Sequence, residues 1–425
     1  MKKIGRVTYD NAVPQPGGAD MLRFVDVDPN VCIGCKNCEY VCPTGAIVGV
    51  DPNDRWSKHH IPNPAKCIYC GQCLVNCPVT AIFERVSYID GVRKAIDDPG
   101  MLTVAMPAPA IRYALGEEFG LSDGSVVEGK MFAALKKLGF DVLWDVQFGA
   151  DVTIMEEGVE FKRRLTGEFD RPLPQFTSCC PGWIRFVETY FPDLIPHLSS
   201  TKTPIQINGM LAKTYGAENI GADPKRMYSV AVMPCVSKKY EGLREENAVN
   251  GRRAIDATID TRELASMIRD AGIDFKSLPD NVSPHPLMGV SSGGGTIFGV
   301  TGGVMEAMLR YAAELLSPEG GERITFSEVR GTGGVREASV DIAGTKLNVA
   351  VVNGLKNAWN ICERMRKGET PYQAIEVMAC PGGCVNGGGQ PYVDWTRRPG
   401  FSALWDMHRI LTERIGPDGM EKRRS

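Results

Sequence analysis

The sequence predicts a chain of mixed α+β and α/β class, in which a small cysteine-rich domain precedes a larger domain of alternating strands and helices. Two tightly spaced cysteine runs lie before residue 80, and apolar strand-like segments alternate with helical stretches after residue 100. A chain of 425 residues with 43% apolar content is also long enough for two to three domains. We divide it into residues 1–97, residues 98–391 and a tail of residues 392–425.

Composition excludes some classes of partner. The net charge of −3 gives no reason to expect nucleic acid, and no apolar run of about 18 residues is present to span a bilayer. The start, Met1 to Arg6, is basic, but polar residues and prolines follow where a signal peptide would be apolar. We therefore expect no nucleic-acid partner, no membrane span and no export signal on this chain.

Eight of the fourteen cysteines form two runs with the same spacing, in which two residues, two residues and three residues separate successive cysteines and a proline follows. Bacterial ferredoxins hold two 4Fe-4S clusters with this spacing, and the fourth cysteine of each run reaches the other cluster. A structural zinc site is the alternative, but zinc ribbons rarely repeat four cysteines at this spacing. The predicted ligand sets are Cys32, Cys35, Cys38 and Cys77 for one cluster, and Cys67, Cys70, Cys73 and Cys42 for the other.

Local patterns predict the elements around these cysteines. Each run precedes a short strand-like segment, at residues 46–50 and 81–83, and the polar stretch 90–100 favours turns and a domain boundary. The second domain then shows the following pattern: a strand at 102–106, helical stretches from Ile111 and over 130–138, a strand at 228–233 that ends before Cys235, and a β-hairpin over 338–352.

Three further motifs carry five cysteines: Thr177-Ser-Cys-Cys-Pro-Gly-Trp183, Met233-Pro-Cys-Val-Ser-Lys-Lys-Tyr-Glu241, and a glycine-rich stretch from Glu376 to Pro391 that contains Cys380 and Cys384. In type and order they resemble the three signature motifs of the FeFe-hydrogenases. The resemblance runs from about residue 28 to residue 391. It implies a ferredoxin-like domain followed by a catalytic α/β domain, with the H-cluster held between two lobes.

The resemblance also implies a cofactor and its surroundings. The H-cluster of this family joins a 4Fe-4S cubane to a two-iron unit that carries carbon monoxide, cyanide and a dithiolate, and the matching thiolates are Cys180, Cys235, Cys380 and Cys384, of which Cys384 bridges both parts. Lys238 and the backbone near Ala108 and Pro109 match the positions that serve the cyanide ligands. The family's apolar wall matches Pro204, Met233, Phe298 and Met378, although composition alone would make them ordinary core residues.

Hydrogen chemistry also requires a route for protons to a buried metal. By resemblance the route from cofactor to solvent comprises Cys179, Glu157, Ser199, Glu160 and Arg164. If residues 155–164 are helical, Glu157, Glu160 and Arg164 share one face. Without the resemblance, such a face is most often a solvated surface.

The function that follows is reversible formation of H₂ from two protons and two electrons, with the ferredoxin-type clusters relaying electrons to a redox partner. The short C-terminal region after Pro391 and the short N-terminal domain resemble the large subunit of dimeric periplasmic enzymes, so we expect a separate small subunit, with a ferredoxin or a c-type cytochrome as electron carrier. Export with a signal-bearing small subunit would place the enzyme in the periplasm; otherwise it is cytoplasmic. A hydrogen sensor and a non-catalytic scaffold for cluster assembly are the alternatives.

Overall fold

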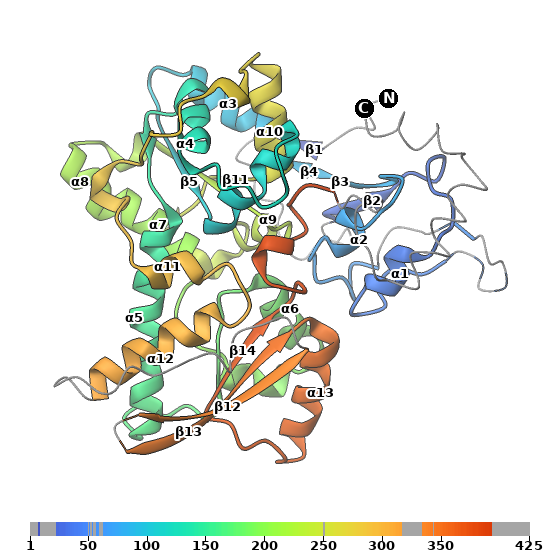
Figure 1. Cartoon of the computed structure of the whole chain (residues 1–425), viewed down its shortest axis with the longest axis vertical. Coiled ribbons are helices and arrows are strands. Elements are labelled where there is room, and N and C mark those ends of the chain that lie inside the picture. Colours follow the sequence, from blue (N-terminus) through green and yellow to red (C-terminus); the bar gives the residue numbers. More distant parts are fainter. Residues whose placement is uncertain are drawn as a thin grey trace.

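The computed structural model describes residues 7–8, 23–49, 51, 53, 57–58, 63–249, 251–316, 334–342 and 344–392. These residues form a small cysteine-rich region beside two larger lobes, and each lobe is built on a four-stranded sheet (Figure 1). Within these ranges no helix is both long enough and apolar enough to cross a membrane. The tail predicted at residues 392–425 lies outside the described residues except for Tyr392.

The cysteine-rich region contains short elements between its cysteine loops. Its strands are β1 (Val7–Thr8), β2 (Val25–Val27), β3 (Ile82–Glu84) and β4 (Val86–Ser87), and its helices are α1 (Asn37–Val41) and α2 (Gln72–Val75). The strand predicted at residues 81–83 is confirmed as β3, which pairs antiparallel with β2. The strand predicted at 46–50 is wrong for residues 46–48, because Ala46 donates its N–H to Cys42 Sγ and accepts from the Asn63 N–H. Val50 lies outside the described residues.

The first lobe is a fully parallel sheet with strand order β11-β8-β5-β6. Its strands are β5 (Leu102–Pro107), β6 (Val142–Leu143), β8 (Met227–Met233) and β11 (Ala257–Asp260), so both strands predicted here are confirmed. Every residue of β8 is buried, as expected for a central parallel strand covered on both faces. The helices that pack on this lobe are α3 (Ile89–Asp97), α4 (Glu128–Lys137) and α10 (Thr261–Asp270).

Helix α3 replaces the turns predicted across residues 90–100. Its buried residues Ile89, Val92 and Ala95 recur every three positions and face the first lobe, so the polar residues between them form the outer face. Only Asp98 to Gly100 form a turn. Downstream, the helical stretch predicted from Ile111 is two short 3₁₀ helices, Pro109–Tyr113 and Leu115–Phe119, whereas the helix predicted at 130–138 is α4.

The second lobe has strand order β12-β13-β14-β7. Strands β12 (Val335–Ile342) and β13 (Thr345–Asn353) form the predicted hairpin, and β14 (Ala374–Met378) and β7 (Gln175–Phe176) extend the sheet in parallel. Helices α6 (Pro181–Tyr190) and α13 (Leu355–Arg366) cover it through an aromatic core that includes Trp183 and Phe186.

One long helix, α5 (Val146–Leu165), runs along both lobes (Figure 1). It packs on α7 (Pro204–Leu211), α11 (Gly293–Ile297) and α12 (Gly303–Leu316). Gly149 allows the close approach of α7, because a Cβ at this position would lie 2.3 Å from Pro204 O. The remaining short elements are the π-helix Ala212–Gly216, α8 (Ala217–Ile220), α9 (Ser237–Glu241), β9 (Ala248–Val249), β10 (Arg252–Arg253) and the 3₁₀ helices Pro192–His197, Pro224–Arg226, Glu245–Asn247, Phe275–Ser277, Pro286–Met288 and Cys384–Asn386.

A buried ion pair fixes the start of α5. Arg112 donates to Asp145, the N-cap of α5, at 3.0 and 2.8 Å, and to Glu128 at 2.6 Å. We expect Arg112→Met to lower the free energy of unfolding of the second domain by about 3–5 kcal/mol, because Asp145 would remain buried without its partner. Urea titration followed by near-ultraviolet circular dichroism measures this. Arg93→Met, which removes an exposed pair with Asp270, is the control and should change stability by less than about 1 kcal/mol; equal stability of the two variants would contradict the prediction.

Candidate active site

Four of the predicted cysteine ligands lie beside the carboxyl ends of strands from both lobes. Cys235 follows β8 of the first lobe, and Cys380 follows β14 of the second. Cys180 comes shortly after β7 and is the N-cap of α6, while Cys384 begins a 3₁₀ turn. Carboxyl ends of parallel strands are where open α/β sheets place their sites. The fold therefore brings three separate loops together at the junction of the lobes.

The thiols of these four cysteines form one electrostatically coupled group. Cys235 interacts with Cys180 and Cys384, and Cys380 interacts with all three. Burial, reinforced by the neighbouring cysteines, raises the pKa of Cys235 and of Cys384 to about 12. No disulfide joins any of the fourteen cysteines, all of which lie among the described residues. Four thiols in one place, that of Cys380 buried and the other three half-buried, are a donor set that fits a 4Fe-4S cubane.

The cysteine-rich region contains two further groups of thiols. Cys35 and Cys38 interact with Cys32 and Cys77, whereas Cys67 and Cys70 interact with Cys42. Cys73 interacts with Cys67, Cys70 and Cys42 of the second group and also with Cys38 of the first. Backbone N–H groups point at several sulfurs, including Ala46 N to Cys42 Sγ at 3.3 Å and Ala81 N to Cys77 Sγ at 3.2 Å. Such hydrogen bonds stabilise thiolate ligands, so these residues fit two cubanes.

The turn between Cys380 and Cys384 requires glycine. Gly382 and Gly383 have φ of +85° and +99°, in the region that side chains rarely adopt. A Cβ on Gly383 would also lie 2.9 Å from Gly299 O, on the segment that pairs with it through a bridge at Val300. This contact ties the cysteine turn to the loop that carries Phe298.

The residues predicted to form the apolar wall lie in more than one part of the core. Phe298 and Met378 pack in the same small cluster as Cys179, and Cys384 lies against this cluster. Met233 belongs instead to the core of the first lobe. Pro204 is the first residue of α7, and Ala108 and Pro109 follow β5 at the carboxyl edge of the first sheet.

Lys238 lies in α9 and is held from two sides. Its Nζ donates to the carbonyl oxygen of Cys179 at 3.3 Å and to Glu241 Oε2 at 2.6 Å. Glu241 is itself buried and accepts from Thr203 Oγ1 at 2.6 Å and Gln206 Nε2 at 3.0 Å. Burial opposes the charged ammonium, but Glu241 more than compensates and raises the pKa of Lys238. Sequence reasoning missed Glu241, although its place three residues after Lys238 in a short helix was the available signal.

The carboxylates predicted to carry protons lie on one buried face of α5. Glu157, Glu160 and Arg164 are all buried, so this face is not the solvated surface that its composition alone would suggest. Glu157 Oε1 accepts from Ser178 N at 3.2 Å, while its Oε2 has no hydrogen-bond partner among the residues that the structure describes. Burial raises the pKa of Glu157 to about 7. A carboxyl with a free oxygen and this pKa can hold a proton near neutral pH.

Ser199 lies between Glu157 and Glu160 and interacts with both carboxylates. The Ser199 hydroxyl donates to Glu160 Oε2 at 3.3 Å and also lies close enough to Glu157 to favour its charged form. Ser200, which sequence reasoning missed beside Ser199, donates to the same Glu160 oxygen through its hydroxyl at 2.7 Å and is exposed. Arg164 binds Glu160 but has a fully buried guanidinium that also donates to Leu198 O at 2.8 Å. Of the residues bound to Glu160, Ser200 is thus exposed, whereas the Arg164 side chain is buried.

Glu376 is a second buried carboxyl that sequence reasoning missed, although it opens the third motif. Its oxygens accept from Gly302 N and Met305 N at 2.7 Å each, at the start of α12. Burial raises the pKa of Glu376 to about 7 as well.

The geometry agrees with what known proteins show. Residues 101–388 match the family model described as the iron only hydrogenase large subunit, C-terminal domain. The chain belongs to the iron-only hydrogenase family. Residues 31–81 of this hydrogenase also match a 4Fe-4S dicluster domain, which together with the fold confirms the predicted order of a ferredoxin-type domain and an H-cluster domain.

Similar proteins support the same activity and cofactors. The chain is 54% identical to the periplasmic Fe hydrogenase large subunit of Nitratidesulfovibrio vulgaris over 91% of each chain. The structure of an apo FeFe-hydrogenase from Chlamydomonas reinhardtii has a TM-score of 0.64 at 38% identity, and the match covers 76% of this chain and 88% of that one. This protein is therefore a hydrogenase with two ferredoxin-type 4Fe-4S clusters and an H-cluster, as predicted. Similarity to a large subunit also implies a small subunit.

A more distant relative bears on the scaffold alternative. The chain is 31% identical to cytosolic iron-sulfur assembly component 3 of Pongo abelii, over 81% of this chain and 74% of that protein. The higher identity to a hydrogenase over more of the chain favours the enzyme.

We expect Glu157 and Glu376 to titrate near pH 7. Each folded-state pKa lies above that of an unfolded glutamate, about 4.3, so each group stabilises the fold when protonated, and this contribution is lost as the pH rises through 7. Infrared difference spectra between pH 5 and pH 9 should show two protonated-carboxyl bands. Glu157→Gln should remove one band and Glu376→Gln the other; a spectrum left unchanged by Glu157→Gln would contradict the account.

Proposed function

We propose that twelve cysteines ligate the metal clusters of this hydrogenase in three sets of four. The first two sets are those of the N-terminal runs, Cys32, Cys35, Cys38 and Cys77, and Cys42, Cys67, Cys70 and Cys73; the third is Cys180, Cys235, Cys380 and Cys384, with Cys384 also reaching the two-iron unit. The observation that carries this proposal is that three loops bring Cys180, Cys235, Cys380 and Cys384 together at the junction of the lobes, apart in sequence from the eight cysteines of the N-terminal runs. When bound, the H-cluster supplies the metal centre at which protons and electrons combine to H₂.

The protein residues around this centre would orient and seal it. Lys238, fixed by Glu241, presents an ammonium beside Cys179, where it suits a small anionic ligand such as cyanide. Phe298 and Met378 exclude water near Cys384. Pro204, Met233 and the backbone at Ala108 and Pro109 complete this set at the edge of the first lobe.

Proton transfer would use the buried groups on and near α5. Cys179 neighbours Cys180 without belonging to the ligand set, and its thiol interacts with Glu157. A proton held on Glu157 can pass to Ser199, whose hydroxyl is shared with Glu160, and Glu160 is bonded to the exposed Ser200. Arg164 would then hold Glu160 in place rather than form the outer end of the route.

The partners follow from the relative. We propose that the chain pairs with a separate small subunit and works in the periplasm, where a ferredoxin or c-type cytochrome exchanges electrons with the N-terminal clusters. Similarity to the periplasmic large subunit from Nitratidesulfovibrio vulgaris supports the small subunit and the periplasmic location.

Hydrogen evolution from chemically reduced viologen, under strict anaerobiosis, tests the function. The protein must carry all three cubanes and the two-iron unit, which iron content and infrared bands of metal-bound carbon monoxide and cyanide report. Rapid hydrogen production is expected. Negligible production with complete cofactors would favour a sensor instead.

The relay role of Cys179 has its own test. Cys179→Ala should lower hydrogen turnover by at least about 10²-fold, because proton transfer through a positioned group contributes about that much, while the cofactor bands remain. Cys362→Ala, which removes a buried thiol inside α13 of the second lobe, is the matched control and should retain turnover. Full activity in Cys179→Ala would remove the thiol from the route.

A further inference from the structure

Three consecutive glycines, Gly387 to Gly389, separate the N-terminal domain from the catalytic lobes. None of them has a positive φ, so their backbone conformation alone does not demand glycine. A Cβ on Gly388 would instead lie 2.1 Å from Cys70 O and 2.6 Å from Gly71 Cα. A Cβ on Gly387 would lie 2.0 Å from Pro234 O, and one on Gly389 would lie 2.8 Å from Cys235 N. Close approach on both sides is therefore what requires these glycines.

The two loops on either side carry ligands of different clusters. Cys70 belongs to the proposed second ferredoxin-type set, and Cys235 belongs to the proposed H-cluster set. Their thiols are electrostatically coupled, and so are those of Cys70 and Cys380. The backbone of residues 387–389 thus fills the space between the loops of the two proposed sites.

Side chains from both domains form hydrogen bonds with this segment and with the residues next to it. Gln72 Nε2 of the N-terminal domain donates to Asn386 O at 2.9 Å. Arg262 of α10 donates to Gly388 O at 3.0 Å and also to Gln390 O. Gln390 is further bound by Thr261 Oγ1 at 2.6 Å. The segment is therefore held by both domains.

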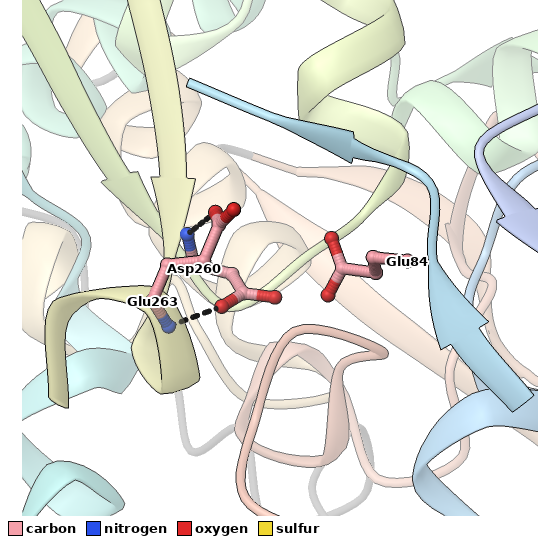
Figure 2. Close-up of side chains that lie close together, drawn as sticks. All are labelled: Glu84, Asp260 and Glu263. Carbon is pink, nitrogen blue, oxygen red and sulfur yellow. Dashed lines mark hydrogen bonds between the residues drawn. The ribbon is translucent and has the colours of Figure 1, made fainter. Parts of the chain in front are cut away.

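Arg262 is itself fixed by a buried cluster of charges. Figure 2 shows Glu84 of β3 pointing toward Asp260 and Glu263 at the start of α10, and carboxylate oxygens of the three lie within 4.8 Å of one another. This spacing would suit a divalent cation, but Arg262 pairs with Glu84 and Asp260, and Lys239 pairs with Glu84 and Glu263. Two cationic side chains therefore already pair with all three carboxylates.

We propose that Gly388, held by Arg262, is a spacer that sets the separation between the second ferredoxin-type cluster and the cubane of the H-cluster. Both are positioning residues, and their role rests on the proposed ligand sets. During hydrogen production one electron leaves the reduced ferredoxin-type cluster, which is oxidised, and the cubane accepts it and is reduced; hydrogen oxidation runs the transfer in reverse. No bond forms or breaks. Because the rate of electron transfer falls as the two clusters move apart, a Cβ at Gly388 that pushed the two loops apart would slow the transfer.

Two variants test the spacer. Gly388→Ala must move the backbone of residues 387–389 away from Cys70 O. Arg262→Lys keeps the glycine but replaces a guanidinium that donates to several acceptors with a single ammonium. Gly293→Ala, at a glycine with open space around its Cβ position, and Arg269→Lys, an exposed residue on the same helix α10, are the matched controls.

The readouts separate cluster spacing from cluster assembly. Iron content and the infrared bands of carbon monoxide and cyanide report loading, and H₂/D₂ exchange reports chemistry that needs no electron transfer between clusters. Electron paramagnetic resonance of the reduced protein reports the magnetic interaction between neighbouring clusters. Stopped-flow absorption after mixing with H₂ reports how fast the ferredoxin-type clusters are reduced.

We expect Gly388→Ala to keep its cofactors and its H₂/D₂ exchange, to lose part of the magnetic splitting and to reduce its ferredoxin-type clusters more slowly than both controls. Arg262→Lys should show the same changes to a smaller extent and decides the matter if Gly388→Ala does not fold. Wild-type splitting and reduction rate in a loaded Gly388→Ala, or in a loaded Arg262→Lys where only that variant folds, would overturn the spacer. Absence of H₂/D₂ exchange in the loaded wild-type protein would instead overturn the proposed function.

Discussion

Burial of thiols at the meeting point of three chain regions is the constraint on which the rest of the structure depends. Four thiolates in one place would repel one another, and burial already raises the pKa of Cys235 and Cys384 to about 12. Iron can offset that charge, so ligation would join loops from both sheets into one unit. The parallel strands explain how this is possible, because β8, β14 and β7 direct their following loops to one junction.

Charge compensation separates the structural carboxylates from those that can carry protons. Glu241, Glu160 and Glu263 each pair with a lysine or an arginine. Glu157 and Glu376 are held mainly by backbone N–H groups, and burial raises the pKa of each to about 7. Near neutral pH the paired groups fix loops and helices, while the other two can gain or lose a proton beside the metal site.

Sequence patterns predicted the elements whose periodicity is strong and whose burial is uniform. The strand β8, the hairpin of β12 and β13, and the helical face bearing Glu157 and Glu160 were all expected. Helix α3 was missed because its polar residues resemble a linker, and its amphipathic spacing becomes decisive only against the first lobe. The buried position of Arg164, the bond of Ser200 to Glu160 and the bond of Glu241 to Thr203 depend on contacts between segments far apart in sequence. No local pattern encodes those contacts.

The thiols at the junction of the lobes are proposed to bind a cubane of their own, separate from the two of the N-terminal domain. The most direct measurement is the iron and sulfide content of anaerobically reconstituted protein before addition of the two-iron unit, compared with Cys380→Ser. We expect about twelve irons per chain, four for each cubane, and about eight in the variant. About eight irons in both proteins, with unchanged paramagnetic resonance spectra, would contradict this proposal.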